Sequence, residues 1–264
     1  MPAIYAHERF GSMVSGYLNR ELQTVIETHR QEFHIGLQGP DIFFFYKGWT
    51  ENAVTRYGAH LHDVLAGPFF EHARKVVRHY GRCSAEYAYL MGFICHYALD
   101  SECHGYVEEM VEKTGVNHVE IEEEFEKYLL REDGIDAISF PAGDLIPTDV
   151  QSAVAIAPFY SRDVDAELVL SCLKDMKMIK RIFTAPCDCK QKLINQTLKL
   201  MGRYEELKGH MYQKEDNPKC AQSNVRLHEL FEQAVPVAVS LLEQFDISGC
   251  TGAPLRERFN RDFK

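Results

Sequence analysis

Three side chains of types that commonly bind metal ions, His96, Asp100 and His104, recur at intervals of four residues. Apolar residues at helical spacing precede them, and a four-residue step on an α-helix turns the side chain by ~400°, so the three share one stripe. The two histidines lie ~12 Å apart along the axis, too far to share one ion with metal–nitrogen bonds of ~2 Å. The spacing therefore favours two ions with the aspartate between them. Polar residues on a solvated or internally hydrogen-bonded helix face would give the same pattern.

A second pair of candidate ligands, His118 and Glu122, opens a later helical segment. The two residues are one turn apart and could hold one ion, with His104 as a third ligand. The acidic run continues with Glu123 and Glu124, and such a run is also typical of a solvated helix start that compensates the helix macrodipole. The sequence leaves both interpretations open.

A further carboxylate, Asp41, follows a Gly-Pro turn and precedes the aromatic run 43–46, with Trp49 close behind. Such a turn presents the side chain at a fixed place. An acid directly before an apolar run calls for a reason beyond solubility, so we take Asp41 as a candidate site residue. The aromatic side chains either line a pocket beside it or belong to the core.

Ten of the twelve histidines precede residue 123, which places the candidate chemistry in the first half of the chain. His60 and His62 lie on different faces of a predicted helix, so we expect only one of them to reach the metal ions. His7 stands one turn before a predicted helix and could add a further imidazole.

Helices must position these residues, because apolar residues recur at three-to-four spacing and no sustained two-residue alternation appears. We expect one all-α domain over residues 1–264, with metal ligands in 1–130 and a packing half in 160–264 that supplies a wall of the pocket. Residues 133–158 are rich in Gly, Pro and Asp and predict a long loop. The predicted helical segments are 8–31, 60–80, 85–104, 118–131, 163–183, 190–209 and 222–245.

The formal net charge of -10 argues against a protein that grips nucleic acid or an anionic membrane through bulk electrostatics, and such partners would need a local cationic site. No apolar stretch approaches the roughly 18 residues of a membrane span, and no leader is evident, so we expect a cytoplasmic protein. Eight cysteines without a regular framework indicate reduced thiols. Cys187 and Cys189 form a short pair that could bind a soft metal, but the usual partner pair is missing.

Taken in order, these motifs resemble the zinc-dependent phospholipase C family, which is related to the single-strand-specific zinc nucleases. The matching pieces are His7, Gly39-Pro40-Asp41, Gly58-Ala-His-Leu-His62, His96-x3-Asp100-x3-His104 and His118-x3-Glu122, and residues 256–263 resemble the family's end. The resemblance implies an all-helical fold with a trinuclear zinc site. It also favours His62 over His60, by its position four residues after the glycine.

Carried over to this chain, the resemblance implies three zinc positions and a phosphoester substrate. Asp41 would also orient the attacking water. Zinc charge in the pocket would let an acidic protein capture a phosphoester small molecule or a phospholipid headgroup. The implied ligands are Asp41, His62, His96 and Asp100 for one ion, His104, His118 and Glu122 for a second, and His7 with a bridging Asp100 for a third.

Two alternatives and one departure accompany this interpretation. His62-Asp63 could be the dyad of an HD-type phosphohydrolase, with Asp100 as its distant acid and His34 or His60 upstream, and the chain could also be a metal- or headgroup-binding module without catalysis. In secreted family members the free amino end ligates the third zinc. Here the corresponding nitrogen would be that of Pro2, exposed only if Met1 were removed.

Overall fold

Residues 4–263 are described by the structure, a computed structural model, with the Cys250 side chain left out. The all-α prediction is confirmed, since the described residues form α- and 3₁₀-helices and no strand. The α-helices are α1 (Ile4–Tyr17), α2 (Arg20–Thr28), α3 (Arg30–Gly36), α4 (Ala53–Asp63), α5 (Gly67–Tyr80), α6 (Ala85–Thr114), α7 (His118–Glu132), α8 (Val150–Ile156), α9 (Ala166–Phe183), α10 (Asp188–Leu200), α11 (Tyr204–Leu207) and α12 (Ala221–Thr251). The 3₁₀-helices are η1 (Gly39–Phe45), η2 (Ala137–Ser139), η3 (Ala142–Leu145), η4 (Ala157–Phe159), η5 (Lys208–His210), η6 (Pro218–Cys220) and η7 (Glu257–Asn260).

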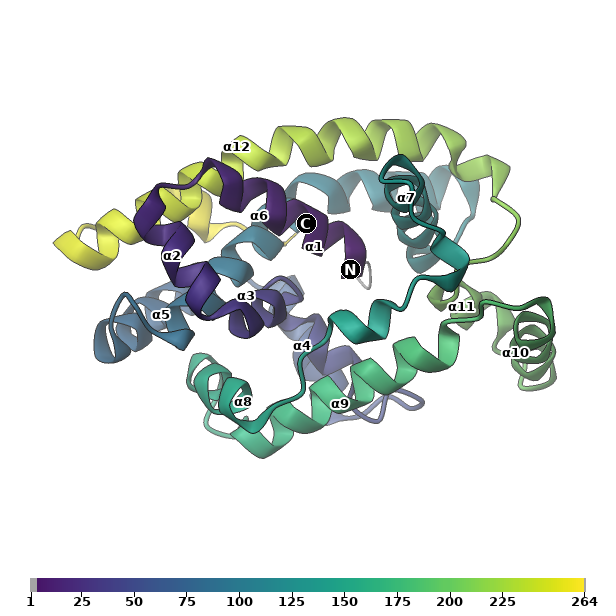
Figure 1. The fold of residues 1–264 in the computed structure, drawn as a ribbon, viewed down its shortest axis with the longest axis horizontal. Coiled ribbons are helices and arrows are strands. Elements are labelled where there is room, and N and C mark those ends of the chain that lie inside the picture. Colours follow the sequence, from purple (N-terminus) through teal and green to yellow (C-terminus); the bar gives the residue numbers. More distant parts are fainter. Residues whose placement is uncertain (1–3, 264) are drawn as a thin grey trace.

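Helix α6 forms the centre of the molecule, with α12 running along it and α1 beside them (Figure 1). Its first half is apolar on all sides, and residues 86–100 are all buried, as expected for a helix enclosed by other helices. The Ser84 side chain caps its start by accepting from the Tyr87 amide, and Gly115 ends it in the left-handed region at φ 69°. The buried half ends at Asp100, so the helix carries its candidate ligands from the core toward the pocket.

Two glycines allow α3 to pack directly on α6. A Cβ at Gly36 would lie 2.1 Å from the Tyr89 carbonyl oxygen, and one at Gly92 would lie 2.2 Å from the Phe33 carbonyl oxygen. Any side chain at either position would therefore force the backbones apart. This close approach brings the end of α3, with the carbonyl of Leu37, next to His96.

Several predicted segments are shorter helices in the structure. The segment 8–31 divides at Asn19, whose side chain caps α2 through the Leu22 amide, and again at His29. The segment 60–80 divides between α4 and α5, and 190–209 divides into α10, α11 and η5. The predicted loop 133–158 contains η2, η3 and α8. Apolar periodicity continues across such breaks because the successive short helices pack against the same core, so periodicity alone did not reveal them.

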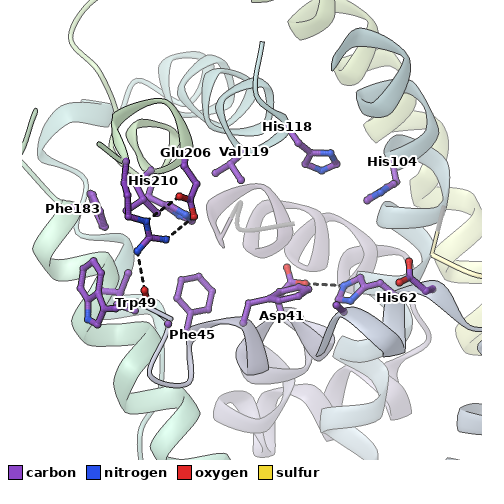
Figure 2. Close-up of a pocket in the computed structure, with 17 residues that line it drawn as sticks. Asp41, Phe45, Trp49, His62, His104, His118, Val119, Phe183, Glu206 and His210 are labelled. Carbon is purple, nitrogen blue, oxygen red and sulfur yellow. Dashed lines mark hydrogen bonds and ion pairs between the residues drawn. The ribbon is translucent and has the colours of Figure 1, made fainter. Parts of the chain in front are cut away.

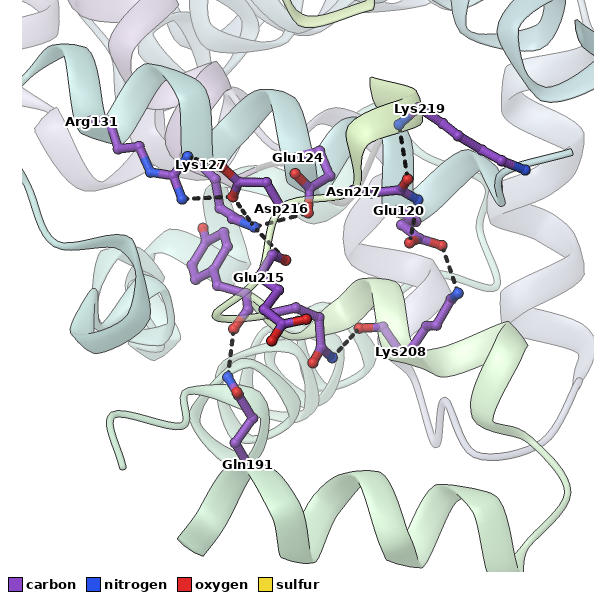
Figure 3. A network of polar contacts seen from close by, with 12 residues as sticks. Glu120, Glu124, Lys127, Arg131, Gln191, Lys208, Glu215, Asp216, Asn217 and Lys219 are labelled. Carbon is purple, nitrogen blue, oxygen red and sulfur yellow. Dashed lines mark hydrogen bonds and ion pairs between the residues drawn. The ribbon is translucent and has the colours of Figure 1, made fainter. Parts of the chain in front are cut away.

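Polar contacts tie α7 to the segment that follows α11 (Figure 3). Glu120 accepts a hydrogen bond from Asn217 and forms an ion pair with Lys208 at 3.1 Å. Buried Lys127 contacts Asp216 at 2.8 Å. These contacts hold residues 208–217 against α7, and they thereby fix the position of α11 and η5 at the pocket wall.

No helix in the described part of the chain is both long and apolar enough to cross a bilayer.

Candidate metal centre

Five of the candidate ligands meet in a buried group, here called the inner cluster, which consists of His7, Asp41, His62, His96 and Asp100. They come from α1, η1, α4 and α6, and each is at most 6% exposed. The short separations are 2.9 Å for His62 Nε2 to Asp41 Oδ1, 3.3 Å for His96 Nε2 to Asp100 Oδ2, and 3.6 Å for His7 Nε2 to Asp100 Oδ1. Two triplets offer ligand atoms within 4.8 Å of one another: His7, Asp41 and His96, and His62, His96 and Asp100.

Backbone carbonyls fix the orientation of two inner-cluster imidazoles. The Gly58 carbonyl accepts from His62 Nδ1 at 2.8 Å, and the Leu37 carbonyl accepts from His96 Nδ1 at 3.2 Å. A proton on Nδ1 leaves the lone pair on Nε2, the arrangement usual for metal-ligating histidines. Neither Nε2 atom has a hydrogen bond of good geometry within the described residues, although each lies close to a carboxylate, His62 to that of Asp41 and His96 to that of Asp100. The donor set therefore fits divalent metal ions.

His7 is fully enclosed within the inner cluster. Its side chain is 0% exposed, and its ring stacks on that of His96 at a centroid distance of 4.5 Å. Burial, followed by the nearby charge of His96, lowers the pKa of His7 to about 3. The imidazole is therefore neutral at pH 7, which is the form that binds metal.

Gly39 determines how Asp41 enters the inner cluster. The glycine has φ +50°, and a Cβ there would lie 2.2 Å from Cδ2 of His96. Pro40 follows within the first turn of η1, and the next residue, Asp41, is 1% exposed. The Gly-Pro-Asp motif thus supplies a backbone conformation, a close approach and a carboxylate in three successive residues.

The remaining candidates, His104, His118 and Glu122, form a second group, here called the outer group. His118 Nε2 lies 2.7 Å from Glu122 Oε1, and the His104 and His118 rings lie 4.8 Å apart. His104 Nδ1 and Glu122 Oε2 are buried and have no hydrogen bond within the described residues. Burial lowers the pKa of His104, whereas the charge and hydrogen bond of Glu122 raise the pKa of His118 despite its burial.

Both groups border one pocket of about 450 Å³. Asp41, His62, His104 and His118 lie toward one side of it, and the aromatic side chains of Trp49 and Phe183 lie toward the other (Figure 2). Phe44 stacks on His62 at 5.1 Å. The pocket therefore joins a polar, metal-compatible side to an apolar one, as ligand sites commonly do.

The pocket wall includes residues that the sequence analysis did not identify, namely Arg203, Glu206 and His210. The guanidinium donates to both Glu206 carboxylate oxygens at 3.0 and 2.6 Å and to the Trp49 carbonyl at 2.8 Å. Burial, followed by the charge of Lys180, lowers the pKa of His210 to about 3, so it is neutral at pH 7. The second half of the chain was expected to supply a wall, but no spacing in it marked these side chains.

The acidic run of α7 is buried, so the solvated interpretation was wrong. Glu122, Glu123, Glu124, Glu126 and Lys127 are each at most 6% exposed. Glu126 accepts hydrogen bonds from the Tyr5 and Ala6 amides and, at 2.5 Å, from the Tyr212 hydroxyl. Because the first amides of a helix lack intrahelical partners, this carboxylate anchors the start of α1 and with it the neighbouring His7.

Other candidates lie elsewhere in the structure. His60 is exposed and faces a different groove. His34 contacts Glu8 rather than either ligand group. The Cys187 and Cys189 thiols are exposed, 3.0 Å apart, and do not line the pocket.

The C-terminal segment covers the inner cluster. Phe263 is 2% exposed, and its ring lies 5.1 Å from that of His62 and 5.9 Å from that of His96. Arg258 donates to Ser101 and Glu102 on α6 at 2.7 Å in each case. This segment thus packs against the ligands themselves, while Met1, Pro2 and Ala3, including the possible amino-end ligand, lie outside the described residues.

A comparison with protein families matches residues 6–178 to the family described as zinc dependent phospholipase C. The matched range contains every residue of the inner cluster and the outer group, and it extends through most of α9. No curated protein and no solved structure matches the chain.

Proposed function

Because the chain belongs to the zinc-dependent phospholipase C family, we propose that it hydrolyses phosphodiesters with a cluster of two or three zinc ions. The observation that carries this proposal is the convergence of the buried inner cluster and the partly buried outer group on one pocket. Isolated buried histidines and acids usually find hydrogen-bond partners in the core. Here Nε2 of His62, Nε2 of His96 and Oε2 of Glu122 form no hydrogen bond of good geometry within the described residues, which is the state expected of ligand atoms placed for metal ions.

We assign the ions to the two groups by proximity and by the resemblance. One ion would be held by Asp41, His62, His96 and Asp100, and a second by His104, His118 and Glu122. A third position would use His7, with Asp100 shared between the inner positions, because its two oxygens face His7 and His96 separately. All these ligands are imidazoles and carboxylates, which suit zinc.

Zinc in such a site acts as a Lewis acid on a phosphoryl oxygen and lowers the pKa of water toward neutrality. The side chains of the protein would orient the attacking water and the substrate. Asp41 borders the pocket and would accept a hydrogen bond from the attacking water, holding it in line with phosphorus. Phe44 and Trp49 would pack against an apolar or cationic leaving portion.

Two other functions are less well supported. The HD-type alternative leaves His104, His118 and Glu122 without roles, and His34 turns toward Glu8. A binding module without catalysis would use the same ligands, so only turnover separates it from a hydrolase. The substrate candidates are a phospholipid headgroup and a soluble phosphodiester.

The test combines metal analysis with turnover. Protein purified without added metal is analysed for zinc, then assayed on a chromogenic phosphodiester before chelation, after chelation and after zinc is restored. We expect more than one zinc per chain and activity near neutral pH that follows the zinc content. If zinc-replete protein turned over no phosphodiester, phospholipid or nucleotide, the binding module would be favoured over the hydrolase. If the protein contained one equivalent of zinc per chain or none, the proposal of a zinc cluster would be wrong.

A further inference from the structure

Helix α10 projects from the body of the protein (Figure 1). Of its 13 residues only Leu198 is buried. Leu193 is 64% exposed and Leu200 is 89% exposed, and Met201 directly after the helix is 55% exposed. Single exposed apolar residues are common, but two large ones on a projecting helix and a third directly after it call for a partner.

Four exposed residues of α10 are arranged in two neighbouring stripes. Leu193 and Leu200 are seven residues apart, two helical turns, and therefore share one face. Lys192 and Lys199 have the same spacing and stand one residue before them, so a basic stripe flanks the apolar one. Both lysines are exposed, and neither forms an ion pair within the described residues. We call Lys192, Leu193, Lys199, Leu200 and Met201 the α10 surface.

The charge of this region contrasts with that of the whole protein. The formal net charge is -10, yet five basic residues and only one acid occur from 181 to 203. Arg181 and Arg203 are paired with Asp144 and Glu206, whereas the three lysines of α10 form no ion pair within the described residues. The acid, Asp188, is paired with Lys214 at 3.0 Å. An acidic protein thus presents a local cationic surface in which apolar side chains are exposed, and this combination complements an anionic lipid headgroup layer over hydrocarbon.

The α10 surface lies next to the pocket. Arg203 follows Met201 by two residues, lines the pocket wall and donates to the Trp49 carbonyl at 2.8 Å. The Trp49 ring also lines the pocket and is 40% exposed. A surface held against α10 would therefore lie close to the pocket that contains the candidate metal centre.

We propose that the α10 surface docks the protein onto anionic phospholipid bilayers. Leucine and methionine side chains would enter the boundary between headgroups and acyl chains, while the lysines contact lipid phosphates. The choice of a lipid surface as partner rests on the proposed function, which places phosphoester hydrolysis in the adjoining pocket. With three apolar side chains and two lysines, attachment is reversible and weakens as salt increases.

The test measures binding separately from turnover. Full-length protein is sedimented with phosphatidylcholine vesicles, with or without phosphatidylserine, at two salt concentrations. The apolar variant carries Leu193→Ser and Leu200→Ser, and the charge variant carries Lys192→Glu and Lys199→Glu. Matched controls on other helices are Val225→Ser with Ile247→Ser, both more than half exposed, and Lys113→Glu. Circular dichroism verifies that each variant is folded.

We expect the wild type to bind vesicles that contain phosphatidylserine and to lose binding at high salt. The vesicle partition coefficient of each α10 variant should be at least about tenfold lower than that of the wild type, because each lysine near an anionic surface changes this coefficient several-fold. The control variants should stay within about twofold of the wild type. On a water-soluble phosphodiester the α10 variants should match the wild type, and on vesicle substrate they should be slower.

The inference is overturned if the wild type does not bind anionic vesicles or if the α10 variants bind them as well as the control variants do. It is also overturned if the α10 substitutions instead dissociate an oligomer of this chain, as seen by gel filtration. Vesicle binding that depends on α10, without turnover of any phosphodiester, would contradict the proposed function and leave the docking surface intact. The two proposals can therefore fail separately.

Discussion

Gly39→Ala should disrupt the metal centre through one added methyl group. At φ +50° an alanine is strained by ~1–2 kcal/mol. Its Cβ would also lie 2.2–2.6 Å from three atoms of the His96 ring, an overlap that typically costs ~1–3 kcal/mol when neighbours must shift. The free energy of unfolding should therefore fall by about 2–5 kcal/mol. Displacement of His96 should weaken zinc binding at the inner cluster as well.

Two other glycines in the chain separate the two contributions. Gly134 has φ +71°, and a Cβ there would meet nothing within 4 Å, so Gly134→Ala should lose only the ~1–2 kcal/mol of backbone strain. Gly105 lies within α6 with open space around it, and Gly105→Ala should gain ~0.5–1 kcal/mol. Urea unfolding with a chelator present measures stability, and calorimetric zinc titration measures binding. The reasoning is refuted if Gly39→Ala is no less stable than Gly134→Ala and binds zinc as the wild type does.

Three further predictions concern individual ligands and their supports. Asp100→Asn should lower zinc content by more than one equivalent, whereas His118→Ala should lose about one; full zinc content and activity in Asp100→Asn would contradict a bridging aspartate. His62→Ala should lose more zinc than His60→Ala by elemental analysis, and the reverse order would contradict the assignment from the family motif. Glu126→Gln should destabilise the fold by ~1–3 kcal/mol through its lost charge-assisted hydrogen bonds and weaken the zinc position nearest α1, and unchanged unfolding and zinc titration would exclude an anchoring role.

The sequence predicted the candidate site better than it predicted the helix boundaries. A helical stripe is a local property, so His96 and Asp100 could be placed on one face of α6 without any knowledge of the fold. The separation of His104 from His96 likewise follows from the helical rise, and the structure places the two in different groups. Helix breaks at Asn19 and after Asp63 depend on weaker capping signals, which apolar periodicity concealed.

The wall of the pocket could not have been predicted in the same way. Arg203 meets Trp49 across 154 positions in the chain, and no local spacing encodes that contact. The pocket wall becomes defined only when α7 binds the segment after α11, through Lys208 on Glu120 and Asp216 on Lys127. In the sequence, the residues of the pocket wall are polar positions on short helices, and no local pattern distinguishes them from other polar residues.

The interpretation of the acidic run of α7 as a solvated helix face was wrong. Burying a carboxylate is costly unless hydrogen bonds or opposite charges compensate it, so an acidic helix start is ordinarily exposed. For Glu126 the compensation comes from distant parts of the chain, the amides of Tyr5 and Ala6 and the hydroxyl of Tyr212. The helix that contributes His118 and Glu122 to the outer group therefore also anchors α1, which contributes His7 to the inner cluster. Any change that loosens α7 should for this reason affect both groups together, although they share no candidate ligand.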